Sequence, residues 1–166
     1  SILIKLDSPG PVLYKQNRMG ENNTRFTVRK FRSMHYDAEK DSGPVWASDE
    51  DPRITRTGAW LRRFRLDEIP QLVNVIKGEM SIVGPRPERP FFIDRLMQEF
   101  PFYYRRHKVR PGITGWSQIK QPYDKDIDDV RKKLKYDFYY IENLSFSLDV
   151  KILARTFWVM LSGKGR

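Results

Sequence analysis

The sequence contains no cysteine and only two histidines, His35 and His107. The lack of cysteine excludes disulfide bonds and thiolate metal sites, and it is compatible with a reducing compartment such as the cytosol. With two histidines, a zinc site would have to take most of its ligands from carboxylates. We therefore expect any metal ion bound by this chain to be a hard, oxygen-ligated cation such as magnesium.

The sequence also lacks a long hydrophobic run. No apolar stretch approaches the roughly 20 residues that cross a bilayer, and the first residues do not have the pattern of a signal peptide. The chain begins, without an initiator methionine, on the largely apolar sequence Ile2-Leu3-Ile4-Lys5-Leu6. This start is typical of the end of an apolar element in a longer protein.

Positive charge is in excess. The 166 residues include 31 lysines and arginines against 21 aspartates and glutamates, which gives a formal net charge of +10. Such an excess points to an anionic partner, for which nucleic acid, an anionic membrane surface and a phosphorylated substrate are the candidates. The length fits one domain with a modest hydrophobic core.

Two short segments, residues 12–18 and 26–34, have the composition of β-strands. They flank the turn sequence Gly-Glu-Asn-Asn at residues 20–23, so we expect a β-hairpin. Phe31 breaks the alternation of the second segment, which would place a bulge there. Residues 37–53, which contain several glycine, proline, serine and aspartate residues, predict a loop.

Hydrophobic spacing and capping residues predict helices along most of the remaining chain. They are expected at residues 57–65, 67–76, 88–100, 127–141 and 148–161. Thr57 and Ser147 are the expected N-caps of the first and the last. A tight-turn loop is expected at residues 110–115, Arg-Pro-Gly-Ile-Thr-Gly. These elements predict a helix-rich, single-domain α+β fold with a small β-hairpin.

Two adjacent carboxylates, Asp67 and Glu68, open the second of these helices. Carboxylates at a helix N-terminus are usually structural, because the unpaired N–H groups and the helix dipole stabilise them by about 0.3–1 kcal/mol. The same position favours phosphate oxygens. Arginines are frequent in the preceding segment, at Arg56, Arg62, Arg63 and Arg65. A structural cap and a catalytic pair are both open interpretations.

An aspartate can attack a phosphorus centre and form an acyl phosphate, which divides one difficult displacement into two. Attack by Asp67 on a diphosphate would bring two anions together, and a magnesium ion between their oxygens would offset the repulsion. Glu68 could bind that metal, orient Asp67 or accept a proton. The pair therefore suggests phosphoryl chemistry.

Arg86 lies between Pro85 and Pro87. The two prolines restrict the backbone, so the guanidinium can be aimed at little entropic cost. Its planar fork suits bidentate contact with phosphate. A structural arginine that caps a helix or pairs with Glu88 is the alternative.

Six segments, taken in order, carry a resemblance to a known family. They are Lys30-Phe31-Arg32-Ser33-Met34, Asp51-Pro52-Arg53-Ile54-Thr55, Leu66-Asp67-Glu68-Ile69-Pro70-Gln71-Leu72, Lys77-Gly78-Glu79-Met80-Ser81-Ile82-Val83-Gly84-Pro85-Arg86-Pro87-Glu88, Arg110-Pro111-Gly112-Ile113-Thr114-Gly115-Trp116 and Tyr136-Asp137-Phe138-Tyr139-Tyr140-Ile141. They resemble the bacterial sugar transferases, which are monotopic polyprenyl-phosphate phosphoglycosyl transferases. The resemblance covers essentially the whole chain, so residues 1–166 are expected to form one catalytic domain.

The resemblance implies that a UDP-sugar donates its phosphosugar to undecaprenyl phosphate and releases UMP, as the first membrane step of exopolysaccharide or glycoconjugate synthesis. It implies that Asp67 is the nucleophile, carries a covalent phosphosugar and contacts Mg²⁺, while Glu68 assists. It also implies that Arg86, and by its position Arg62, contact phosphate.

The resemblance implies a membrane surface as a partner, at the cytoplasmic face of the bacterial inner membrane, and a membrane-inserted helix before residue 1. Residues 91–104 would then lie at the membrane surface as an amphipathic segment, unless their apolar side chains simply pack in the core. Nucleic acid is not an expected partner, and a homo-oligomer is compatible with the resemblance.

Two segments depart from the family pattern. Arg65 stands where a small hydroxyl residue is common, which affects the local capping. Residues 117–123, Ser-Gln-Ile-Lys-Gln-Pro-Tyr, replace an Asn-Gly form and resemble a subgroup linked to exopolysaccharide assembly. We expect the identity of the sugar to be read near this second segment.

Three further residues have two interpretations each. Asp137 either reaches the site or pairs with an arginine or lysine. His107 is expected to be an interfacial or surface histidine rather than a general base. Trp116 could stack on a base or sugar, although packing within the protein is the expected role.

A basic nucleic-acid-binding module without catalysis is the alternative function. Its basis is the net charge of +10 and the aromatic residues Tyr14, Phe26 and Phe31 on the predicted hairpin. No recognised RNA-binding signature supports it, and the basic residues are spread through the motifs. An inactive interaction domain is a third interpretation.

Overall fold

The computed structural model of the protein describes residues 1–40, 43, 51–121 and 127–163. Within this part of the chain, helices predominate and the strands form two two-stranded sheets, which confirms the helix-rich α+β class. Of the loop predicted at residues 37–53, residues 41, 42 and 44–50 lie outside the described residues.

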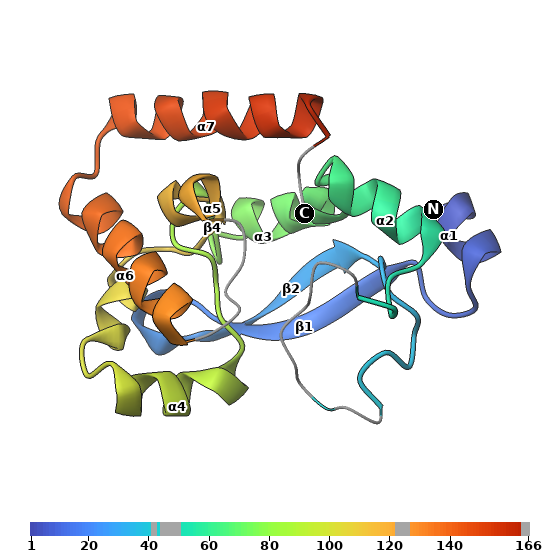
Figure 1. Ribbon diagram of the computed structural model, residues 1–166, viewed down its shortest axis with the longest axis horizontal. Coiled ribbons are helices and arrows are strands. Elements are labelled where there is room, and N and C mark those ends of the chain that lie inside the picture. Colours follow the sequence, from blue (N-terminus) through green and yellow to red (C-terminus); the bar gives the residue numbers. More distant parts are fainter. Residues whose placement is uncertain (41–42, 44–50, 122–126, 164–166) are drawn as a thin grey trace.

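The α-helices are α1 (Ile2–Asp7), α2 (Arg56–Arg63), α3 (Leu72–Ile76), α4 (Pro90–Glu99), α5 (Trp116–Lys120), α6 (Ile127–Glu142) and α7 (Phe146–Leu161). The strands are β1 (Leu13–Met19), β2 (Arg25–Phe31), β3 (Ser81–Val83) and β4 (Gly112–Thr114). Short 3₁₀ helices are η1 (Glu21–Asn23), η2 (Leu66–Gln71) and η3 (Tyr103–Lys108). In Figure 1, the hairpin of β1 and β2 crosses the middle of the molecule, with α4 below it and α2, α3, α5 and α7 above it.

The β-hairpin forms as predicted. Its antiparallel register runs without interruption from Leu13 opposite Phe31 to Met19 opposite Arg25, so the predicted bulge at Phe31 is wrong. The alternation breaks because Phe31 shares its side of the hairpin with Leu13, whereas Phe26 lies on the other side.

The predicted N-caps are each two residues too late. Thr55 caps α2, since its hydroxyl accepts a 3.0 Å hydrogen bond from the Gly58 N–H, whereas the Thr57 N–H donates to the Asp7 carboxylate at 2.7 Å. Ser145 caps α7 in place of Ser147. Thr55 and Ser145 each lie three residues before the amide that they bind, which is the reach of an N-cap hydroxyl.

The segment that carries the paired carboxylates is a 3₁₀ helix, η2, continued by the short helix α3. A single α-helix was expected there. Arg65, which precedes η2, has a left-handed backbone (φ 54°) and no side-chain cap, an uncommon conformation for a residue other than glycine. Gly78, with φ 75°, follows α3 and ends it as predicted.

The tight-turn loop predicted at residues 110–115 is wrong, because residues 112–114 form β4, which pairs in parallel with β3. The glycines there serve close backbone approach. A Cβ on Gly112 would lie 2.1 Å from the backbone nitrogen of Gly84, and a Cβ on Gly84 would lie 2.5 Å from the Arg110 carbonyl oxygen. Strand pairing therefore needs glycine at both positions.

Small hydrophobic clusters make up the core. One joins α4, η3 and α6 through Ile93, Leu96, Tyr103, Val130 and Leu134. It confirms the helices predicted at residues 88–100 and 127–141 in outline, and it shows that the apolar side of α4 packs inward. A second cluster involves the hairpin, and a third joins β3, α6 and α7.

Helix α1 is fastened to the hairpin by one arginine. The buried guanidinium of Arg32, just after β2, donates to the carbonyl oxygens of Ile4 (3.2 Å), Ser8 (2.7 Å) and Pro9. These carbonyls lie at the end of α1 and just beyond it, where a helix terminus leaves carbonyl groups short of partners. The Ile4 carbonyl also accepts a hydrogen bond from the backbone N–H of Ser8. Among the described residues, no helix combines the length and the apolar character needed to cross a bilayer.

Candidate active site

Asp67 and Glu68 lie in η2, which packs against β2. Both side chains are largely buried, and both line a cavity of about 880 Å³. Arg62, from α2, and Arg86, from the segment after β3, line the same cavity. The tertiary structure thus brings together all four residues that the sequence singled out.

Two cations hold the Glu68 carboxylate. Its Oε1 lies 2.8 Å from Lys30 Nζ and 2.9 Å from Arg86 Nη2. Burial by itself would raise the pKa of Glu68, but the charges of Arg86 and Lys30 outweigh it and hold that pKa well below its ordinary range. Glu68 is therefore a stable anion. Arg86 pairs with Glu68 and not with Glu88, the structural partner considered from the sequence.

Asp67 has a different environment from its neighbour. Its carboxylate makes no hydrogen bond or ion pair with any residue that the structure describes. Burial, and then the negative charge of Glu68, raise the pKa of Asp67. The nearby cations Lys30, Arg62 and Arg86 oppose this rise without cancelling it. Environments that separate the pKa values of two carboxylates suit them to different roles. Glu68 is held as a fixed charge, whereas Asp67 faces the cavity without a hydrogen-bonded partner among the described residues.

A second buried carboxylate, Glu88, lies on the cavity wall. Its two oxygens lie 3.4 Å from Arg18 Nη1 and 3.5 Å from Lys133 Nζ. Burial opposes its ionisation, but Lys133, Arg18 and Arg106 lower the pKa of Glu88 to about 2. Burial also lowers the pKa of Arg18 to about 10. The charges of Glu88, Arg18 and Lys133 are therefore paired with one another on this part of the cavity wall.

Sequence reasoning missed Lys30, Arg18 and Lys133 as cavity residues. Lys30 belongs to one of the six motif segments, so its place in a motif was an available signal. Arg18 and Lys133 lie in none of those segments, and they reach the cavity from β1 and α6. Their role follows only from the packing of these elements.

The backbone of Arg86 contacts a buried ion pair between Arg106 and Asp137. Arg106 Nη2 donates a 2.8 Å hydrogen bond to the Arg86 carbonyl oxygen and lies 2.8 Å from the Asp137 carboxylate. Both side chains of the pair are 1% exposed. This decides between the two interpretations of Asp137: it pairs with an arginine, and that arginine contacts the backbone of Arg86.

His107 is buried, so the expected surface position is wrong. Its Nδ1 lies 2.6 Å from Asn23 Oδ1 in the hairpin turn. Burial, and then the charge of Arg106, lower the pKa of His107 to about 4. The run of basic residues in η3 concealed this position, because a charged run usually lies on the surface.

Trp116 stacks on Tyr139, with ring centres 5.8 Å apart and planes inclined at 27°. It does not line the large cavity, so packing is its role on that side of α5. The three aromatic residues considered for nucleic acid do not form a common surface, because Phe26 is buried and Phe31 lies on the side of the hairpin opposite Tyr14.

The residues at the cavity fit a magnesium ion that takes only part of its ligands from protein. Among the described residues, no group of three or more histidine, aspartate and glutamate side chains is placed to hold a metal ion. Mg²⁺ is often bound by one or two carboxylates together with substrate phosphates and water. Asp67 fits this pattern, since no described side chain occupies its oxygens, whereas Lys30 and Arg86 already hold Oε1 of Glu68.

Comparison with known proteins identifies the family of this chain. The sequence profile of the family described as bacterial sugar transferase matches residues 1–163. The chain is 50% identical to the UDP-N-acetylgalactosamine-undecaprenyl-phosphate N-acetylgalactosaminephosphotransferase of Aeromonas hydrophila, over 99% of this chain and 39% of that protein.

Two further relatives match at similar levels. The undecaprenyl-phosphate glucose phosphotransferase of Komagataeibacter xylinus is 45% identical over 94% of this chain and 30% of that protein. The exopolysaccharide production protein PSS of Rhizobium leguminosarum bv. phaseoli is 45% identical over 99% of this chain and 86% of that protein. The chain therefore spans between 30% and 39% of the length of the two phosphotransferases, and most of the exopolysaccharide production protein.

Proposed function

Because this chain belongs to the bacterial sugar transferase family, we propose that it transfers a sugar phosphate from a UDP-sugar to undecaprenyl phosphate and releases UMP. The names of two relatives support undecaprenyl phosphate as the acceptor, and one of them names a UDP-linked donor. These two names differ in the sugar, N-acetylgalactosamine or glucose, so the sugar is left to experiment.

The first step uses Asp67 as the nucleophile. One carboxylate oxygen forms a bond to the phosphorus that carries the sugar, while the bond from that phosphorus to the bridging oxygen of the diphosphate breaks. The bridging oxygen leaves with UMP and takes the electron pair. In the second step an oxygen of undecaprenyl phosphate attacks the same phosphorus, and Asp67 leaves as a carboxylate. Both attacking oxygens are anionic, so neither step needs a proton transfer at phosphorus.

The observation that carries this proposal is the unequal environment of the two adjacent carboxylates. Glu68 is neutralised by Lys30 and Arg86, whereas Asp67 makes no hydrogen bond or ion pair with the described residues and faces the cavity. A raised pKa makes the Asp67 oxygen a stronger nucleophile once it is ionised. A purely structural helix cap would instead be occupied by backbone N–H groups.

Arg86 and Arg62 are proposed to contact the phosphates of the donor. Both line the cavity, and a guanidinium fork suits two phosphate oxygens at once. When Mg²⁺ is bound, with Asp67 as its protein ligand, it would reduce the repulsion between carboxylate and diphosphate. Glu68 is proposed to assist by keeping Lys30 and Arg86 in place beside the reacting phosphorus.

A lipid acceptor requires the protein to work at a membrane surface, and we propose the cytoplasmic face of the bacterial inner membrane. The polyprenyl chain stays in the bilayer, so only its phosphate can reach the cavity. The net charge of +10 favours an anionic surface of this kind.

The experiment that tests the proposal is to trap the enzyme with the donor alone. The full-length protein, purified in neutral detergent, is incubated with UDP-glucose or UDP-N-acetylgalactosamine and Mg²⁺, without acceptor, and its mass is measured. We expect a gain equal to one sugar phosphate, located on Asp67 by peptide sequencing. Undecaprenyl phosphate added afterwards should remove it.

Asp67→Asn is the matched control, since it keeps the shape of the side chain and removes the anionic oxygen. We expect turnover to fall by about 10⁴-fold or more, as for other catalytic nucleophiles, with the circular dichroism spectrum unchanged. An enzyme that turns over with both substrates, yet never gains mass with any donor alone, would show that no covalent intermediate forms.

A further inference from the structure

The last helix, α7, exposes a hydrophobic face. Figure 1 shows it along one edge of the molecule, with one side toward the rest of the fold. Ile152 is its only fully buried residue. Five of its exposed apolar side chains follow one another at three- and four-residue spacings and therefore share a face. They are Phe146, Val150, Leu153, Phe157 and Leu161.

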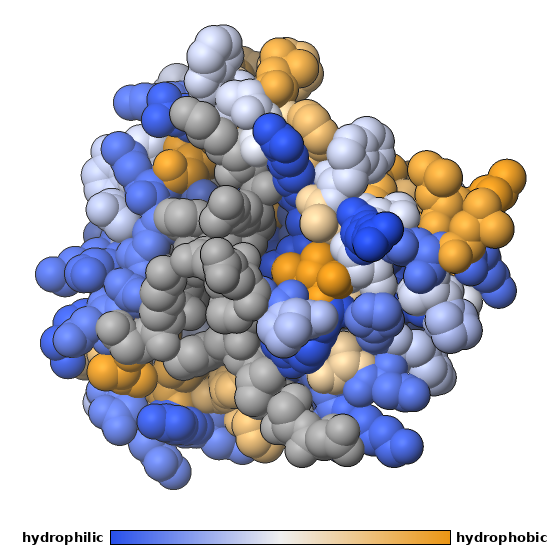
Figure 2. All heavy atoms as spheres, turned by 45° about the vertical axis from the view of Figure 1, so that its right-hand side comes forward, coloured by the Kyte–Doolittle hydropathy of each residue, from blue (hydrophilic) through white to orange (hydrophobic). Residues whose placement is uncertain are grey.

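This face is part of an uneven surface. In the view of Figure 2, hydrophilic side chains dominate the left side, and hydrophobic side chains also project at the right, below the level of the upper edge along which α7 lies in Figure 1. Phe157 and Leu161 of α7 are 62% and 64% exposed, which is high for large hydrophobic residues that follow one another on a helix.

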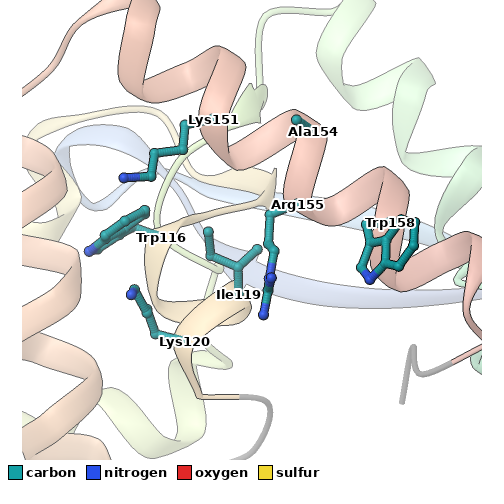
Figure 3. Close-up of a pocket in the computed structure, with 7 residues that line it drawn as sticks. All are labelled: Trp116, Ile119, Lys120, Lys151, Ala154, Arg155 and Trp158. Carbon is teal, nitrogen blue, oxygen red and sulfur yellow. The ribbon is translucent and has the colours of Figure 1, made fainter.

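A pocket of about 510 Å³ lies between α7 and α5. Its lining, drawn in Figure 3, consists of Trp116, Ile119 and Lys120 from α5 and Lys151, Ala154, Arg155 and Trp158 from α7. Lys151, Arg155 and Trp158 follow at four- and three-residue spacings, so they occupy a face of α7 beside the hydrophobic one. Basic residues therefore border the apolar face along the helix, as in helices that lie in a membrane interface.

Three basic side chains line this pocket. The Nζ atoms of Lys120 and Lys151 lie 4.8 Å and 5.5 Å from the centre of the Trp116 ring, and Figure 3 shows both chains ending near the indole. Neither these lysines nor Arg155 forms an ion pair with a carboxylate in the described part of the chain. Contact with an aromatic face orients an ammonium group but does not neutralise it. The pocket therefore offers uncompensated charge to an anion.

We propose that this pocket binds the phosphate head group of an anionic phospholipid, while the exposed face of α7 lies against the acyl chains. Lys120, Lys151 and Arg155, which line the pocket, would supply the positive charge. Charge complementarity and the continuous surface favour a lipid, because the cations border an apolar helix face that has no packing partner among the described residues. A free anion would contact only the cations, and a nucleic acid would leave the apolar face of α7 exposed to water. A phospholipid would cover both.

This pocket is separate from the catalytic cavity. The short helix α5 lies between them: Ser117 and Gln118 line the cavity, whereas Trp116, Ile119 and Lys120 line the pocket. The acceptor phosphate has to reach Asp67, so the head group bound here would belong to a lipid of the surrounding membrane. The proposal also moves the expected membrane contact from residues 91–104 to α7, which lies on the other side of the hairpin in Figure 1.

Native mass spectrometry tests the proposal. The intact protein in neutral detergent is titrated with short-chain phosphatidylglycerol or, as the uncharged comparison, short-chain phosphatidylcholine, and lipid adducts are counted. We expect one tightly bound molecule of phosphatidylglycerol per protein, and no corresponding adduct with phosphatidylcholine. Lys120→Gln/Lys151→Gln should weaken phosphatidylglycerol binding by about tenfold or more, since each cation near an anionic lipid contributes to affinity.

Lys132→Gln/Lys135→Gln is the matched control, because it removes two exposed lysines of α6 and the same total charge. It should bind phosphatidylglycerol like the parent protein, and equal thermal unfolding of both double variants shows that each is folded. An equal loss of phosphatidylglycerol binding in the two double variants would overturn the proposal, because it would show that the overall positive charge, and not this pocket, attracts the lipid. Displacement of the lipid by millimolar inorganic phosphate would reassign it as a free-anion site, and displacement by a single-stranded oligonucleotide would reassign it to nucleic acid. Mass gain on Asp67 is measured in parallel, so failure here is distinguishable from failure of the proposed reaction.

Discussion

The guanidinium of Arg106 donates a 2.8 Å hydrogen bond to the backbone carbonyl oxygen of Arg86. The proposed phosphate-binding arginine is therefore held at its main chain by a second arginine, whose own charge is compensated by Asp137 at 2.8 Å. The two flanking prolines restrict the backbone of Arg86, and Arg106 determines where that backbone lies.

Replacement of Asp137 should unfold the protein more easily. Asp137→Ala leaves Arg106 as an uncompensated buried charge, which costs about 3–5 kcal/mol in the free energy of unfolding. Urea denaturation followed by circular dichroism measures this cost. Asp128→Ala, which breaks the exposed pair with Arg131, is the control and should cost about 0–1 kcal/mol. Similar midpoints for the two variants would contradict the importance of the buried pair.

Replacement of Arg86 by lysine should not be conservative. Lysine keeps the charge beside Glu68 but loses the planar fork, so contact with two phosphate oxygens is lost. We expect kcat to fall by about 10²–10³, the usual effect of removing one donor that stabilises charge in the transition state. Steady-state UMP release measures it. Arg95→Lys, on the exposed side of α4, should have no effect, and an equal kcat for both variants would remove Arg86 from the reaction.

The acid side of the pH–rate profile should respond to Glu68. Asp67 must be ionised to attack, so activity is lost as the pH falls through its pKa, which the charge of Glu68 helps to raise. Glu68→Gln removes that negative charge and lowers the pKa of Asp67. The acid limb should therefore move to lower pH, although kcat on the plateau falls because Lys30 and Arg86 lose their common partner. A limb that stays in place or moves to higher pH would contradict the coupling.

Stability should fall in mild acid because of His107. Its folded-state pKa of about 4 lies below the ordinary value of 6.5, so the unfolded chain binds a proton first. The contribution of neutral His107 to stability is complete above pH 6.5 and is lost as the pH falls toward 4. Urea midpoints at pH 7.5 and 5.5 measure this loss, and His107→Gln should show a smaller difference between them. A variant with the same pH dependence as the parent would assign the loss to other groups.

Much of the fold followed from local patterns. The hairpin, α4, α6 and α7 were predicted because apolar spacing and turn residues act within short segments. The N-caps at Thr55 and Ser145 were missed by two residues because several hydroxyl residues lie near each helix start and only geometry decides which one reaches an amide. β4 was taken for a turn because Gly112 and Gly115 have the composition of a turn but serve close backbone contact.

The linear order of residues was sufficient to single out Asp67, Glu68 and Arg86, because adjacent carboxylates and a proline-flanked arginine have a chemistry that depends on neighbours in the chain. Arg62 was singled out only through the resemblance to the family. Folding alone decided that Lys30 neutralises Glu68, that Arg106 and Asp137 hold Arg86, and that His107 is buried. Those contacts join residues 38, 20 and 84 positions apart. Charge interactions depend on distance and burial in space, and neither can be read from positions along a chain.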